Sequence, residues 1–216
     1  MRIGMVFVVV VGLLLSAGPI VAEQYLFDYY GFSWEESNLL QEVGFIDQIM
    51  PPLTADLVNY QYTFAWVDLN IDSAIPMGPY WRYTYVGGSF RVYEDASFNA
   101  WYDDSNCPSL TLISDPSTFT DSELYLEAVV DTIIHMYNSM TKIGSFSGTI
   151  SYVGGTHLGE IPLGFRDGTV FGGTTANPLG CIPVGCDYRW DGQAFSLEQP
   201  VGAEHNSWGA VKSLYR

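Results

Sequence analysis

The stretch YQYTFAW, residues 60–66, decides the fold class. Aromatic residues occupy every second position, and Gln, Thr and Ala fill the positions between them. A period of two is the pattern of a half-buried β-strand, because successive side chains of a strand point to opposite faces of the sheet. We therefore expect a β protein.

Three further stretches repeat this pattern. Residues 80–94 alternate around Gly87-Gly88, which predicts a β-hairpin with its turn at the two glycines. Residues 145–152 alternate apolar residues with Ser and Thr. Asp191-Gly192 lies between two short apolar runs and is typical of a type I′ hairpin turn.

Two segments allow a helix. Residues 121–138 have apolar residues at helical spacing but also alternate, and their β-branched content favours a long strand. Residues 34–41 follow Ser33, a suitable N-cap, with Glu36 at the third helical position, so we expect a short helix there.

The fold class that follows is an all-β antiparallel β-sandwich or jelly-roll-like fold, with a short N-terminal and a short C-terminal helix. Parallel α/β folds are disfavoured because no amphipathic helices separate the strands. We expect a lead-in at 23–48, a β-sandwich domain at 49–200 and a tail at 201–216.

Residues 1–22 have the features of a cleaved secretory signal peptide. Arg2 precedes an apolar run at 3–15, and Ala22 ends a suitable cleavage site. This predicts a secreted protein, located outside the cell, in the periplasm or on the cell surface.

The charge balance excludes one class of partner. The 216 residues carry 24 Asp and Glu against 8 Lys and Arg, a formal charge of −16. Such a chain has no basic surface to neutralise phosphates, so we expect neither nucleic acid nor anionic membranes as partners.

The three cysteines are candidates for a disulfide in an oxidising compartment. Cys181 and Cys186 enclose Pro183 and Gly185, which favour a tight turn, so we expect a Cys181–Cys186 bridge. The alternative is that Cys107 pairs with one of them and leaves the other free.

One acidic segment is a candidate calcium site. Carboxylates and amides gather after residue 94, and such groups repel one another unless a cation or solvent separates them. The candidate ligands are Asp95, Asn99, Asp103 and Asp104. No other cofactor is indicated.

Trp101 and Tyr102 lie within this acidic segment. Aromatic rings beside carboxylates suit the stacking of a sugar and hydrogen bonds to its hydroxyls, so both are candidate ligand-binding residues. The same rings also suit a protein core.

No catalytic residue is assigned. His157 and Glu160 form an HxxE spacing in a Gly-rich loop, which differs from the HExxH of zinc proteases. A carboxylate pair of the kind that hydrolyses glycosides remains an alternative, because the sequence does not give the separation of two acids.

The tail contains a motif, Trp208-Gly209-Ala210-Val211-Lys212-Ser213-Leu214-Tyr215-Arg216. With short motifs at 92–95, 116–121, 152–156 and 190–192, it resembles a group of secreted bacterial all-β proteins that have no assigned activity. The resemblance implies secretion and an all-β body. The motif residues are Trp208, Gly209, Lys212, Leu214, Tyr215 and Arg216.

Two roles fit this tail. Trp208, Val211 and Leu214 have the spacing of a short helix face, which could pack on the domain. The tail could instead address the protein to an export or anchoring machine.

The expected function is a structural or glycan-binding module, with a glycan or another surface protein as partner. The alternatives are a carbohydrate hydrolase and a calcium-dependent adhesive module.

Overall fold

The computed structural model describes residues 24–106, 110–177 and 181–196. Over these ranges the chain forms eleven strands: β1 (Gln24–Glu36), β2 (Leu39–Ile49), β3 (Gln61–Met77), β4 (Tyr80–Val86), β5 (Ser89–Asp95), β6 (Tyr102–Asn106), β7 (Leu110–Ile113), β8 (Glu123–Asn138), β9 (Ile143–Gly154), β10 (Thr169–Ala176) and β11 (Tyr188–Ser196). Three short 3-10 helices are η1 (Pro116–Phe119), η2 (Leu158–Glu160) and η3 (Leu163–Phe165). No helix in these ranges has the length and apolar character needed to cross a membrane.

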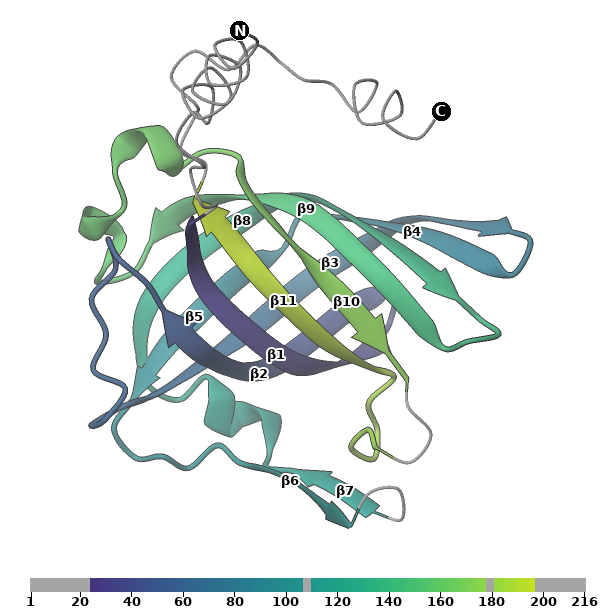
Figure 1. Cartoon of the computed structure of the whole chain (residues 1–216), viewed down its shortest axis with the longest axis horizontal. Helices are drawn as coiled ribbons and strands as arrows, with labels where there is room; N and C mark the ends of the chain where they lie inside the picture. Colours follow the sequence, from purple (N-terminus) through teal and green to yellow (C-terminus); the bar gives the residue numbers. More distant parts are fainter. Residues whose placement is uncertain (1–23, 107–109, 178–180, 197–216) are drawn as a thin grey trace, which may run out of the picture.

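The main sheet closes on itself as an antiparallel barrel (Figure 1). The strands follow the ring in chain order: β1, β2, β3, then β4 and β5 end to end, then β8 to β11, which pairs with β1 again. With β4 and β5 counted as one, the barrel has eight strands. The predicted sandwich or jelly roll is wrong, because the main sheet closes on itself and the second sheet among the described residues consists of β6 and β7 alone.

Neither of the two predicted glycine hairpins forms. β4 pairs with residues 70–77 of β3 and β5 with residues 61–67, so the chain continues in one direction through Gly87-Gly88. Both glycines have positive φ, and a Cβ at Gly88 would lie 2.4 Å from the Val67 carbonyl oxygen. Gly192 lies inside β11, paired with both neighbouring strands.

The predicted helix at 34–41 is also wrong. Residues 24–49 form the β1–β2 hairpin, so the expected lead-in supplies two barrel strands. Its turn is Ser37-Asn38, and both residues have positive φ, as a type I′ turn requires. The strand predicted over 121–138 is confirmed as β8. The expected C-terminal helix lies outside the described residues.

Aromatic side chains fill the barrel interior, as in other eight-stranded barrels whose lumen is just wide enough for side chains. Inward-facing glycines give them room: a Cβ at Gly31 or Gly44 would lie within 2.7 Å of the Phe64 ring. The interior aromatics include Phe27, Tyr29, Phe64, Trp66, Phe90, Phe146, Phe171 and Trp190.

A carboxyl and an imidazole are buried in this interior. Glu42 is 1% exposed, and within the described part of the chain no group hydrogen-bonds its Oε1. Burial raises the pKa of Glu42 well above its usual value. His135 has its Nε2 2.7 Å from Thr175 Oγ1, and burial lowers its pKa to about 4.

A second, smaller core lies outside the barrel. Residues 96–106 and 110–122, which include β6, β7 and η1, cover the outer face of β2, β3 and β5 (Figure 1). Phe119 is fully buried there against Phe45, and its carbonyl accepts a hydrogen bond from Thr63 Oγ1 at 2.8 Å. This covering segment forms one wall of the site described next.

The predicted Cys181–Cys186 bridge is wrong. Cys186 has a free thiol, whereas Cys181 is disulfide-bonded. The alternative pairing involves Cys107, which lies outside the described residues. Burial and the nearby Asp187 raise the pKa of the Cys186 thiol to about 11, so it stays protonated at neutral pH.

Candidate ligand pocket on the outer barrel wall

A cavity of about 470 Å³ lies between the outer face of the barrel and the covering segment. Strands β1 and β2, the β2–β3 loop, the start of β3 and residues 98–102 contribute to it. Its lining is mainly aromatic and contains one carboxylate: Tyr30, Phe45, Ile46, Asp47, Leu57, Tyr60, Gln61, Tyr62, Phe98, Ala100, Trp101 and Tyr102.

Strand alternation supplies the barrel side of the pocket. Tyr29 points into the barrel core, so its neighbour Tyr30 points outwards. Tyr30 and Phe45 are cross-strand partners on β1 and β2, and their ring centroids are 5.4 Å apart. These two rings form an aromatic floor.

The opposite side of the pocket is held by polar contacts. Asp95, which is buried, accepts hydrogen bonds from the backbone N–H and the hydroxyl of Ser97 and so shapes the chain after β5. Gln61 Nε2 donates to the Ala100 carbonyl at 2.9 Å, and Trp101 N–H donates to Ser114 Oγ at 3.1 Å. The wall is therefore fixed although its aromatic rings reach solvent.

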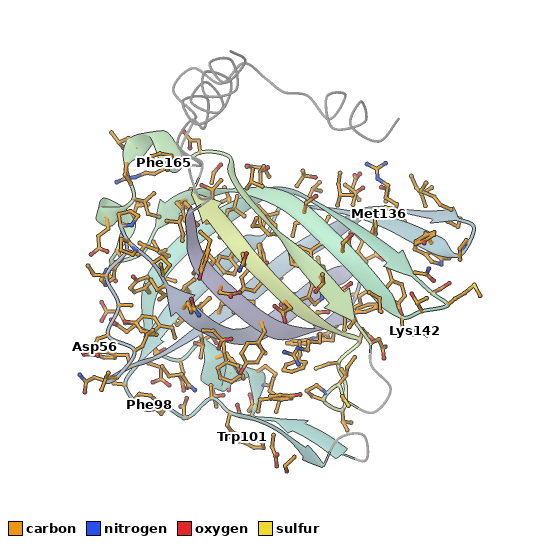
Figure 2. All side chains as sticks on the ribbon, in the orientation of Figure 1. Asp56, Phe98, Trp101, Met136, Lys142 and Phe165 are labelled. Atoms are coloured by element: carbon orange, nitrogen blue, oxygen red, sulfur yellow. The ribbon has the colours of Figure 1, made fainter. Side chains whose placement is uncertain are left out.

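The aromatic rings at the rim differ in exposure. Trp101 is 48% exposed and Phe98 is 50% exposed (Figure 2). Tyr102 instead packs on the buried Phe32 of β1, with ring centroids 4.6 Å apart. Trp101 and Phe98 are thus available to a ligand, and Tyr102 anchors the segment to the barrel.

Asp47 gives the pocket its charge. Partial desolvation raises the pKa of this carboxyl, Asp28 and Asp191 raise it further, and Arg189 opposes them. The Arg189 guanidinium also lies 5.4 Å from the centre of the Tyr30 ring. The pocket therefore offers ring faces and a hydrogen-bond acceptor, beside an excess of negative charge.

Both predicted ligand-binding residues, Trp101 and Tyr102, line this pocket. Phe45 and Asp47 were not predicted as pocket residues, because they belong to the segment interpreted as a lead-in. Residues 43–47, Val-Gly-Phe-Ile-Asp, do not alternate between apolar and polar residues, so their sequence carries no clear signal of the outward-facing side chains. The predicted tail motif, 208–216, lies outside the described residues.

Three of the predicted calcium ligands, Asp95, Asn99 and Asp103, hydrogen-bond to groups of the protein itself. Asp95 is used within its own turn, Asn99 Nδ2 donates to Asp121, and Asp103 accepts from the Ser105 N–H. The Asp104 side chain is outside the described set. Over the described ranges, no three His, Cys, Asp or Glu side chains are grouped as a metal site.

The HxxE residues connect two loops. His157 Nδ1 is 3.1 Å from Glu160 Oε1, and Glu160 accepts hydrogen bonds of 2.7 Å from the N–H and the hydroxyl of Thr54. These contacts tie the β2–β3 loop to η2, so the pair has a structural role. The two Thr54 bonds and His157 lower the pKa of Glu160.

Comparison with known proteins assigns no family. No protein-family model matches the chain, and neither a curated protein nor a solved structure shows significant similarity to it.

Proposed function

We propose that this protein is a secreted binding module that takes a glycan in the outer-wall pocket. The observation that carries the proposal is the aromatic cavity with Trp101 exposed at its rim and Asp47 at its edge. A sugar ring stacks its C–H face on an aromatic ring and donates its hydroxyls to a carboxylate. Secretion rests on residues 1–22, and a protein that stays inside the cell with these residues attached would contradict it.

The number and the separation of the carboxyl groups favour glycan binding over glycoside hydrolysis. Glycoside hydrolysis uses two carboxyl groups that flank the scissile bond, and Asp47 is the one carboxyl among the pocket residues described above. The two buried carboxyls, Glu42 and Asp95, do not pair either. Glu42 faces Trp66 and Asp95 faces Gln61, five residues apart on β3, which is about 16 Å along a strand.

The test is a glycan-array screen of the protein from residue 23, followed by titration calorimetry with any glycan that binds. We expect Trp101→Ala to weaken binding at least about tenfold, because a stacked ring is lost. Tyr80→Ala is the matched control, since Tyr80 is 46% exposed but lies on β4, away from the pocket. Equal loss in both variants, or no glycan binding, would contradict the proposal.

A further inference from the structure

The β3–β4 and β8–β9 turns project from one end of the barrel (Figure 1). Register places the side chains of Ile75, Met77, Tyr80, Met136 and Ile143 on the outer face of this end, and Met140 lies in the β8–β9 turn. We call these six residues the apolar tip. Apart from the half-buried Met136, they are 45% to 79% exposed.

The apolar tip lies in stretches of the chain that are free of acidic residues. Residues 73–93 and 132–159 contain no Asp or Glu. The chain has 24 acids in 216 residues, one in nine, so these 49 residues would carry about five at the average frequency. They carry Arg82, Arg91 and Lys142 instead. Arg82 lies directly opposite Ile75 and Lys142 lies in the turn beside Met140, whereas Arg91 on β5 pairs with Glu127.

Hydrogen bonds hold the two turns together before any partner binds. The Pro79 carbonyl accepts hydrogen bonds from the backbone N–H of Ser139 at 2.9 Å and from its hydroxyl at 3.0 Å. Asn138 Oδ1 accepts from the Met140 N–H at 2.9 Å. Exposing these apolar side chains on a fixed surface costs hydration free energy, which burial in a partner recovers at little entropic cost.

We propose that the apolar tip inserts into the surface of a phospholipid membrane of near-zero net charge. The apolar side chains would enter the interface, Tyr80 would sit at the headgroup level, and Arg82 and Lys142 would contact lipid phosphates. A second copy of this chain is the less favourable occupant, because each copy carries a formal charge of −16 and the two would repel.

The geometry leaves room for this insertion. Interfacial segments enter a bilayer by about 5–10 Å. On β3 the first carboxylate behind the tip is Asp72, five residues before Met77 and so about 16 Å away along the strand. On β8 the first is Asp131, seven residues before Asn138. Both carboxylates would stay in water while the tip is inserted.

The experiment is co-sedimentation of the protein from residue 23 with phosphatidylcholine vesicles. Residues 1–22 are omitted because their apolar run would bind lipid by itself, and every barrel strand is retained. We expect the double variant Met77→Ser/Met140→Ser to lower the partition coefficient at least about tenfold, because apolar area no longer leaves water. Leu163→Ser is the matched control: Leu163 is 78% exposed, like Met140 at 79%, but lies in η3.

A second arm separates charge from apolar insertion. With 30% phosphatidylglycerol at low salt we expect weaker binding, because the acidic body is repelled, and recovery as salt screens the repulsion. The proposal is overturned if the wild type does not sediment with phosphatidylcholine, or if Leu163→Ser loses as much binding as the double variant. It is also overturned if sedimentation velocity shows a dimer that the double variant dissociates while lipid binding is unchanged. None of these outcomes depends on Trp101, so the glycan proposal stands or falls separately.

Discussion

The burial of the Glu42 carboxyl affects the stability of the folded protein. Its carboxyl faces the barrel interior, where a Cβ added to Gly31 would lie 2.8 Å from Oε1. No cation neutralises it among the described ion pairs. A buried carboxylate without a partner is costly, so the raised pKa means that the folded protein keeps the proton.

This burial predicts a pH dependence of stability. Below the ordinary pKa of 4.5 the carboxyl is protonated in both the folded and the unfolded states, so it imposes no ionisation penalty. As the pH rises above 4.5 the unfolded state ionises first, and stability falls until the folded pKa is reached. We expect Glu42→Gln to raise the free energy of unfolding by about 1 to 3 kcal/mol at pH 8 and to change it little at pH 4.5.

Urea unfolding at pH 4.5, 6 and 8 measures this effect. Glu36→Gln is the control, since Glu36 is exposed at the end of β1 and its substitution should stay within about 0.5 kcal/mol. Identical pH profiles for the wild type and Glu42→Gln would show that Glu42 is not the titrating group. The sequence could not reveal this residue, because Gln41-Glu42-Val43 has the polar content of a surface strand.

At the scale of elements, the β1–β2 turn shows where local signals mislead. Ser33 and Glu36 have the spacing of a helix N-terminus, but they precede a two-residue turn rather than a helical turn. Ser37 has φ 54° and Asn38 has φ 72°, values that Asn tolerates better than most residues. Long-range pairing of β1 with β11 and of β2 with β3 then decides in favour of strands.

We expect Asn38→Val to destabilise the protein by about 1 to 3 kcal/mol, because a β-branched residue is strained at positive φ. Asn38→Gly should leave stability unchanged or raise it by less than about 1 kcal/mol, because Gly adopts this conformation freely. Thermal and urea unfolding of both variants provide the measurement. Equal losses in the two variants would mean that the Asn38 side chain matters and the turn geometry does not.

The same comparison explains which elements the sequence predicts. The alternation at 60–66, 121–138 and 145–152 identifies strands, since that pattern depends only on neighbouring residues. Gly87-Gly88 and Asp191-Gly192 look like turns locally, yet Gly192 is required because a Cβ there would lie 2.7 Å from Tyr29 and Phe146. The sequence alone does not distinguish a glycine required by interior packing from a glycine required by a turn.

At the scale of the whole molecule, a period of two cannot distinguish a sandwich from a barrel. Both have one apolar face per strand, and the difference lies in whether the first strand meets the last. The pocket was partly predictable for a related reason: Trp101 and Tyr102 lie close together in the sequence, whereas Tyr30 and Phe45 reach the site only through the closed ring.

Ring closure predicts the result of a truncation. Deleting residues 24–49 would be harmless if the domain began at residue 49, but in the barrel it removes β1 and β2 and exposes the aromatic interior. We expect the truncated protein to be insoluble or to lack a cooperative thermal transition, whereas deletion of residues 1–22 alone keeps both. Circular dichroism melting of the two truncated proteins decides, and a cooperative melt after deletion of 24–49 would refute the closed ring.

The pairing of β1 with β11 also determines when the barrel can close during synthesis. Gln24 faces Ser196, 172 positions later in the chain. The edge of β1 that pairs with β11 therefore has no partner until almost the entire barrel has been synthesised. Pairings of such long range form slowly, and an open sheet edge is prone to join a neighbouring chain. Until β11 has been synthesised, the protein therefore depends on factors that keep the unpaired edge of β1 from pairing with another nascent copy.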